Sequence, residues 1–239
     1  MNIVPDKAHH SWNSFLCRLD VKNELIKIEA FLKDTTFFPE EKNILKFLEL
    51  NKKDIKVIIV GMEPYPSSYE KNGKTCPVAT GRSFEIANLD NWNQKFKQSS
   101  LRNILKTIYF NYRKENIGLE EIRNKILTGE FDILQPKDWF NNLESQGVLF
   151  LNASLTVKPY NVKSHIKIWE PFITMLIKEL DNNNIKWLLW GKDAQDRVLP
   201  LIDANNAICS CHPRLPDFIQ QNCFQYIDCI NWKGKKTDK

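Results

Sequence analysis

Four short apolar runs constrain the fold of this chain more than any other feature of its sequence. They lie at 56–60, 148–151, 187–190 and 207–211, and three of them are almost continuously apolar. Such runs are typical of strands that are buried on both faces of a parallel sheet. Helical spacing fills two of the intervals, from an N-cap at Ser100 to Tyr112 and from near Trp169, where Pro171 is tolerated only in the first turn. Alternating strands and helices predict an α/β domain with a mainly parallel sheet.

The remaining sequence fits one domain over residues 1–239. No Pro-, Gly- or Ser-rich linker divides the chain, and 42% apolar with 26% charged residues is typical of a globular protein. We expect a helical lead-in over 1–50, with helices at 12–32 and 44–50, and a core at 56–232. No run approaches the ~18 apolar residues that span a bilayer, and the N-terminus lacks a secretory apolar stretch. We therefore expect a cytoplasmic protein without membrane contact.

Charge and cysteine content say less about function. The net charge of +5 is compatible with a nucleic-acid partner but does not require one. Cys209, Cys211 and His212 invite a metal site, yet structural zinc sites use C-x2–4-C pairs rather than C-x-C. The run around Cys209 alternates like a strand, in which cysteine serves as a small apolar residue. We therefore predict no metal and six free thiols.

A polar residue follows each of the four predicted strands. Glu63 comes after the first run, Asn152 ends the second, Lys192 follows the third and His212 follows the fourth. Each alone reads equally well as a turn, cap or structural residue. Because ligands bind beyond the carboxyl ends of the strands in open α/β sheets, the four together predict a polar site at one edge. These patterns alone leave open whether the chain is an enzyme or a binding protein.

Several motifs go further, because they resemble those of family 1 uracil-DNA glycosylases in the order and spacing of that family over 56–232. G-M-E-P-Y-P at 61–66 resembles the water-activating loop G-Q-D-P-Y-H, and H-P-R-L-P at 212–216 resembles the intercalation loop H-P-S-P-L. The remaining matches are V-L-F-L-N-A-S-L-T-V at 148–157, L-L-W-G-K-D-A-Q at 188–195, T-G-R-S-F at 80–84 and S-L-R-N-I at 100–104.

The resemblance implies a three-layer α/β/α fold around a four-stranded, mainly parallel sheet. It implies a monomer that cleaves the N-glycosidic bond of uracil in single- or double-stranded DNA, starting base excision repair without metal or cofactor. The uracil would be flipped out of the strand. Family members are also sensitive to DNA-mimicking inhibitor proteins.

Carried over to this chain, the resemblance assigns four residues to the uracil. Phe84 would stack on the ring, and the Asn152 carboxamide would pair with N3–H and O4, since an amide offers both a donor and an acceptor. Tyr65 would fill the space beside C5 and exclude the methyl group of thymine. The backbone N–H of Met62 would assist at O2.

Catalysis and DNA contact fall to further residues. Glu63 would orient the attacking water, and a neutral His212 would donate to O2 as negative charge develops there. The resemblance places the following residues against DNA: Pro64, Ser100, Lys192, Pro213, Arg214 and Leu215. Leu215, Arg214 and Phe218 are the candidates for the intercalating wedge.

Three positions of the first motif depart from the family pattern. Glu63 stands for Asp, Met62 for Gln and Pro66 for His. The extra methylene of Glu63 moves its carboxylate by roughly 1.5 Å. These changes keep an alternative open, namely a weakly active or inactive DNA-binding scaffold with the same fold. A glycosylase for another base would need the Tyr65 wall to be moved. We assign no role to the extended segment 111–138.

Overall fold

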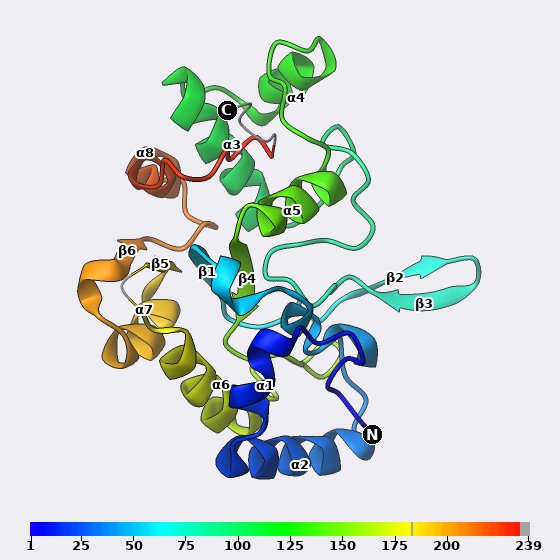
Figure 1. The fold of residues 1–239 in the computed structure, drawn as a ribbon. Coiled ribbons are helices and arrows are strands. Elements are labelled where there is room, and N and C mark those ends of the chain that lie inside the picture. The colour runs from blue at the N-terminus through cyan, green and yellow to red at the C-terminus, as the bar shows by residue number, and fades with distance from the viewer. Residues whose placement is uncertain (183, 235–239) are drawn as a thin grey trace.

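The computed structural model describes residues 1–182 and 184–234, so the end of the predicted domain lies outside the described residues. Its central sheet contains β1 (Val57–Gly61), β4 (Val148–Asn152), β5 (Lys186–Trp190) and β6 (Ala207–Ser210). The order is β4-β1-β5-β6, and every neighbouring pair is parallel (Figure 1). The predicted four-stranded parallel sheet is confirmed, with each strand within about a residue of its apolar run.

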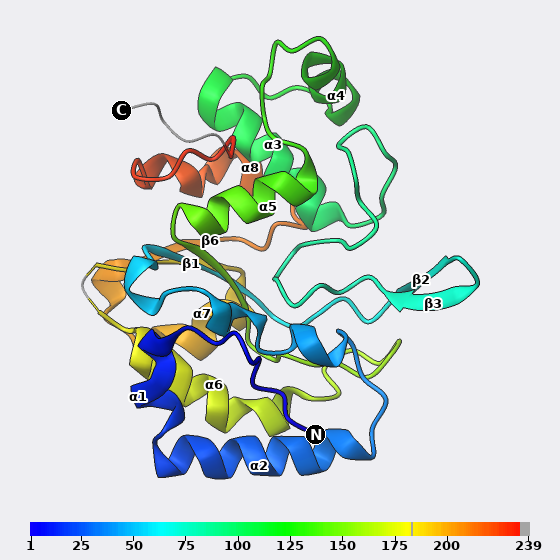
Figure 2. The same ribbon diagram turned by 45° about the vertical axis from the view of Figure 1, so that its right-hand side comes forward.

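The sheet is covered by helices on both faces, because successive side chains of a strand point to opposite sides. In β1, Ile58 and Val60 pack into one apolar core, and Val57 and Ile59 pack into the other. Figure 2 shows the three layers. The first core lies under α1 (Asn13–Leu16), α2 (Leu19–Lys33), α6 (Ile166–Leu180) and α7 (Lys192–Val198). The second lies under α3 (Ser99–Arg113), α4 (Leu119–Leu127), α5 (Pro136–Ser145) and α8 (Phe218–Gln221).

Two helix starts differ from the prediction. α3 begins at Ser99, and its N-cap is Gln98 without a side-chain bond, so Ser100 lies in the first turn rather than at the cap. α6 begins at Ile166, which places Pro171 inside the helix instead of in its first turn. The proline cannot donate to the carbonyl of Lys167. Lys167 is exposed, so water can satisfy that carbonyl.

The helical lead-in is broken where one helix was expected. Arg18 is extended, with φ −63° and ψ 137°, and this separates α1 from α2. The segment predicted helical at 44–50 contains a 3-10 turn rather than an α-helix. All 3-10 turns among the described residues are short: His10–Trp12, Glu41–Asn43, Lys46–Glu49, Lys52–Asp54, Leu199–Leu201, Ala204–Asn206 and Cys223–Tyr226.

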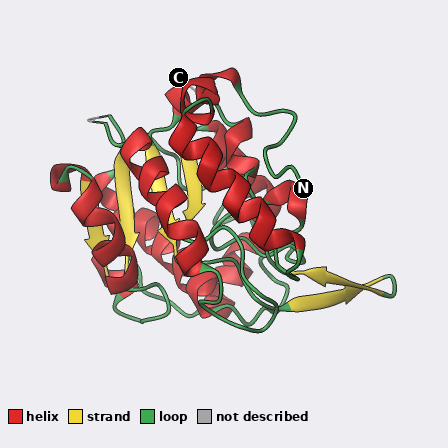
Figure 3. Cartoon of the chain, turned by 90° about the horizontal axis from the view of Figure 1, so that it is seen from below, coloured by secondary structure: helices red, strands yellow, loops and turns green. Residues whose placement is uncertain are grey.

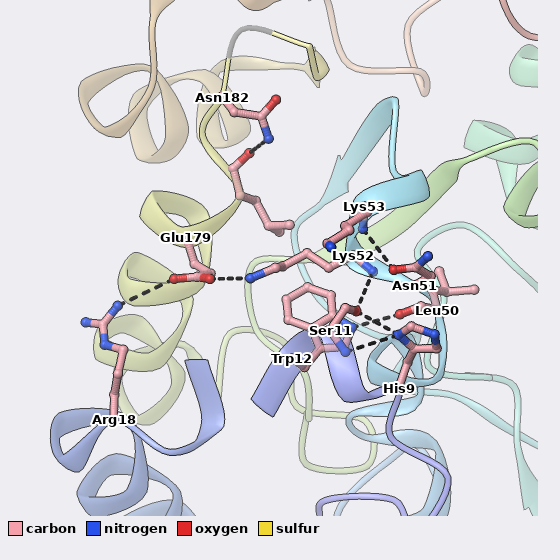
Figure 4. Close-up of polar contacts among 11 residues, drawn as sticks. His9, Ser11, Trp12, Arg18, Leu50, Asn51, Lys52, Lys53, Glu179 and Asn182 are labelled. Carbon is pink, nitrogen blue, oxygen red and sulfur yellow. Dashed lines mark hydrogen bonds and ion pairs between the residues drawn. The ribbon is translucent and has the colours of Figure 1, made fainter. Parts of the chain in front are cut away.

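Polar contacts fasten the lead-in to the body of the protein (Figure 4). Glu179 of α6 forms ion pairs with both Arg18 and Lys52. The indole of Trp12 donates to the carbonyl of Leu50 at 2.8 Å. The first fifty residues therefore belong to one of the two layers that cover the sheet.

A β-hairpin that was not predicted projects from the body. β2 (Ser68–Lys71) and β3 (Lys74–Pro77) pair antiparallel around Asn72 and Gly73, which have φ values of 52° and 71°. The Asn-Gly pair is the expected sequence of such a two-residue turn, so the signal was present. Figure 3 shows the hairpin leaving the side of the molecule on which the sheet strands end.

The segment 111–138 contains the end of α3, all of α4 and the start of α5. Within the described ranges, no helix has both the length and the apolar character that crossing a membrane requires.

Candidate active site

The carboxyl ends of the sheet strands bring the predicted polar residues to one edge. β4 lies on one side of β1 and β5 on the other. The order in which strands are added to the sheet therefore reverses between β1 and β5. Ligands bind at such a switch point in open α/β sheets. Glu63 follows β1, Asn152 ends β4, and His212 follows β6.

The side chain of Asn152 is buried at the carboxyl end of β4. It is 1% exposed. Gly61 is its register partner on β1. A Cβ at Gly61 would lie 2.5 Å from Asn152 Oδ1 and 2.7 Å from Ser83 Cβ, so only glycine leaves room here.

Phe84 places an aromatic ring next to this carboxamide. Its Cε2 lies 3.6 Å from the position of a Cβ at Gly61, and its ring centroid lies 5.2 Å from that of Trp190 at the end of β5. Phe84 has a φ of 65°, which is unfavourable for a bulky residue. Its neighbours hold it there, because Arg82 pairs with Glu85 at 3.0 Å and also with Glu144.

His212 is a neutral hydrogen-bond donor in this arrangement. Its Nδ1 accepts from the backbone N–H of Arg214 at 3.1 Å, which places the remaining proton on Nε2. Burial, together with the nearby Arg214, lowers the pKa of the His212 imidazole. Gly191 has a φ of 91°, and a Cβ there would come within 2.9 Å of His212 Cβ. Glycine therefore permits the close approach of β5 to the His212 loop.

The carboxylate of Glu63 is held by a backbone amide from a distant turn. The N–H of Lys163 donates to both oxygens, at 3.0 Å and 2.8 Å. Burial raises the pKa of the Glu63 carboxyl, and the Lys163 N–H opposes that shift. Lys163 has a φ of 62° and follows a turn closed by the bridge between Lys158 and Asn161. Sequence reasoning missed Lys163, because a backbone N–H leaves no signal in the residue type.

The other residues of the first motif face different surroundings. The Tyr65 hydroxyl is buried without a partner within the described part of the chain, and burial raises its pKa. The carbonyl of Met62 accepts from the N–H of Ser154 at 3.0 Å. Its side chain lines a separate cleft of about 570 Å³ beside α6 and α7. Pro64 is buried, which leaves its ring little surface for DNA.

The loop after His212 gathers several of the expected DNA contacts. Lys192, Arg214 and Leu215 line, with His212, a cavity of about 520 Å³. Leu215 is 44% exposed. Phe218, another wedge candidate, is fully buried with its ring 5.1 Å from that of Trp190, and so it is excluded.

α3 supports this loop through a residue that sequence reasoning did not single out. Asn103 Nδ2 donates to the carbonyl of Pro213 at 2.6 Å, and Pro213 itself is buried. Ser100 lies one turn earlier in α3. The position of Asn103 within the S-L-R-N-I motif was the available signal.

Two of the cysteines, Cys209 and Cys211, line the cavity beside His212. All six are free thiols, and no cluster of three or more metal-type side chains occurs in the described ranges. Cys209 is exposed rather than packed, because β6 is the edge strand of the sheet.

Comparison with known proteins identifies the family. The model of the uracil DNA glycosylase superfamily matches residues 47–222. The chain therefore belongs to the uracil-DNA glycosylase superfamily. A uracil-DNA glycosylase of Lactobacillus delbrueckii subsp. bulgaricus is 30% identical over 213 residues, covering 85% of this chain and 80% of the relative. One of Flavobacterium johnsoniae is 30% identical over 220 residues, covering 87% and 84%.

Solved structures share the fold of this uracil-DNA glycosylase family member. The UNG crystal structure from Nitratifractor salsuginis superposes with a TM-score of 0.71 at 20% identity, covering 94% of this chain and 93% of that one. A mimivirus UNG in complex with UGI gives a TM-score of 0.64 at 21% identity, covering 89% and 73%. The predicted α/β/α architecture is that of the family.

Proposed function

We propose that this protein hydrolyses the N-glycosidic bond of uracil in DNA and so starts base excision repair. The observation that carries the proposal is the buried carboxamide of Asn152 at a strand end, beside the ring of Phe84. An amide can pair with N3–H and O4 of uracil, whereas cytosine presents the reversed pattern. Phe84 supplies the stacking surface, and Tyr65 excludes a methyl group at C5.

The residues proposed for hydrolysis act at two places, C1′ of the sugar and O2 of the uracil. Glu63 accepts a proton from a water molecule, whose oxygen bonds to C1′ of the sugar as the C1′–N1 bond breaks. The electron pair of the broken bond passes to uracil, which takes up a proton after release. His212 Nε2–H and the backbone N–H of Met62 stabilise the negative charge at O2. The raised pKa of Glu63 suits a residue that receives a proton.

Glu63 replaces the shorter Asp of the family motif, and its surroundings account for the difference. The N–H of Lys163 binds both oxygens and fixes the longer side chain in one position. We propose that this turn absorbs the extra methylene, so that Glu63 still orients the water.

The substrate partner is uracil-containing DNA, single- or double-stranded. Leu215 is the proposed wedge, since it is exposed and lines the cavity beside His212. Ser100, Lys192 and Arg214 are proposed to face phosphates, with Pro64 and Pro213 shaping the loops beneath them. Such contacts make binding salt-sensitive. The mimivirus relative binds UGI, and we propose that DNA-mimicking inhibitors also block this protein.

The protein is proposed to act as a cytoplasmic monomer in which 1–239 form one domain. Residues of the lead-in support the single domain, because Trp12 and Phe15 lie in the same apolar core as Ile58 of β1.

The test is uracil release from a single-stranded oligonucleotide, which avoids the cost of opening a duplex. The protein should release uracil, and Asn152→Ala should lower kcat/KM about 1000-fold, because a buried amide is lost from the base. Glu63→Ala should lower kcat strongly, whereas Glu170→Ala, an exposed carboxylate on α6, serves as the matched control and should not. Tight DNA binding without any release would instead support the scaffold alternative.

A further inference from the structure

Two segments beside Glu63 join into one surface, which we call the ledge. It consists of the turn 158–163 and the hairpin 68–77. The N–H of Tyr160 donates to the carbonyl of Pro66 at 2.8 Å, and the hydroxyls of Tyr160 and Ser68 lie 2.5 Å apart. The same turn carries Lys163, whose N–H holds Glu63. The ledge is therefore continuous with the proposed reaction site.

The turn displays an aromatic ring to solvent. Tyr160 is 72% exposed and Val162 61% exposed. Tyr160 also has a φ of 59°, a backbone conformation that is costly for an aromatic residue. The Tyr160 hydroxyl is anchored by Ser68, so the strained turn holds the face of the ring open to solvent.

The tip of the hairpin displays positive charge. Lys71 lies directly opposite Lys74 across the two strands, and like charges in this position destabilise a hairpin. None of the ion pairs between described residues involves either lysine. Glu70, the nearest acid along the strand, is engaged by the Thr75 hydroxyl at 2.6 Å. With two lysines and one acid, the hairpin carries a net positive charge.

We propose that the ledge binds the single-stranded DNA that flanks the target nucleotide, with Tyr160 stacking on a base and the two lysines binding phosphates. Aromatic platforms interleaved with cations bind single strands in this way without sequence preference. Tyr160 lies three residues from Lys163, at most roughly 11 Å along the chain. The hairpin extends from the strand-end side of the sheet, so one strand can pass from the site onto the ledge (Figure 3). This inference rests on the proposed function and deepens it.

The test is the dissociation constant for a 15-nucleotide single strand without uracil, measured by fluorescence anisotropy, so that binding is separated from turnover. Tyr160→Ala should raise Kd about tenfold, the loss expected for one base–aromatic stack. Tyr160→Phe keeps the ring and should stay close to the original protein. Unchanged melting temperatures would show that the variants are folded.

The contribution of the two lysines is measured from the salt dependence of Kd. The double variant Lys71→Gln/Lys74→Gln should reduce the slope of log Kd against log salt by about 1.4, since each single-strand phosphate contact contributes about 0.7. Lys22→Gln/Lys33→Gln, two exposed lysines on α2 in the outer layer, is the matched control and should leave the slope unchanged. Equal Kd values and slopes for all these proteins would overturn the proposal that the ledge binds DNA. Failure of the proposed function would appear separately, as absence of uracil release.

Discussion

The two sides of the proposed site are built in different ways. On the base side, Asn152 and Gly61 are strand ends in register, and Phe84 packs directly against them. On the water side, Glu63 stands on a loop, and its position depends on an amide 100 residues further along the chain. The base side is therefore specified by the sheet itself. The water side depends on a distant turn, which allows the motif to vary if the turn varies with it.

Among changes that leave the proposed functional side chains in place, the largest effect should come from crowding the base side. In Gly61→Ala, the new Cβ would lie 2.5 Å from Asn152 Oδ1, and either the strand or the carboxamide must move. A displacement of about 1 Å can cost about 100-fold in rate, so we expect kcat/KM for uracil release to fall by that factor. Gly118→Ala is the matched control, because a Cβ there meets nothing within 4 Å. Unchanged kinetics in Gly61→Ala would show that the base side tolerates movement.

A smaller effect should appear on the water side, as a decline of kcat when the pH is lowered. The proposed mechanism requires an ionised Glu63, and burial raises the pKa of this carboxyl above its usual value of 4.5. As pH falls, kcat should therefore decline with a midpoint above 4.5. The pKa of His212 is lowered, so this imidazole stays neutral to a lower pH than an ordinary histidine. The profile would contradict the assignment if kcat stayed level to below pH 4.5.

The sequence predicted the base side better than the water side, for physical reasons. Continuous apolar runs identify buried parallel strands, and the residues that follow such strands must share an edge. Asn152 and His212 could therefore be placed without a structure. Lys163 could not, because its contribution is a backbone N–H whose position depends on a turn with positive φ.

Other features of the structure that differ from the prediction either left no signal in the sequence or left one that was overlooked. The exclusion of Phe218 as the wedge required knowing that its ring packs on Trp190. Pro171 lies inside α6 because the carbonyl that it leaves unpaired is at an exposed position, which spacing alone does not show. The hairpin, in contrast, carried the Asn-Gly signal of its turn.

The most direct test of the account is the rate of uracil release by Glu63→Asp. If the Lys163 turn has adapted to a glutamate, the shorter side chain cannot reach the amide and the water together, and kcat should fall about 100-fold with little change in KM. An aspartate that matches or exceeds the original rate, although it is the residue of the family motif, would show that the turn does not position the carboxylate and would contradict the account.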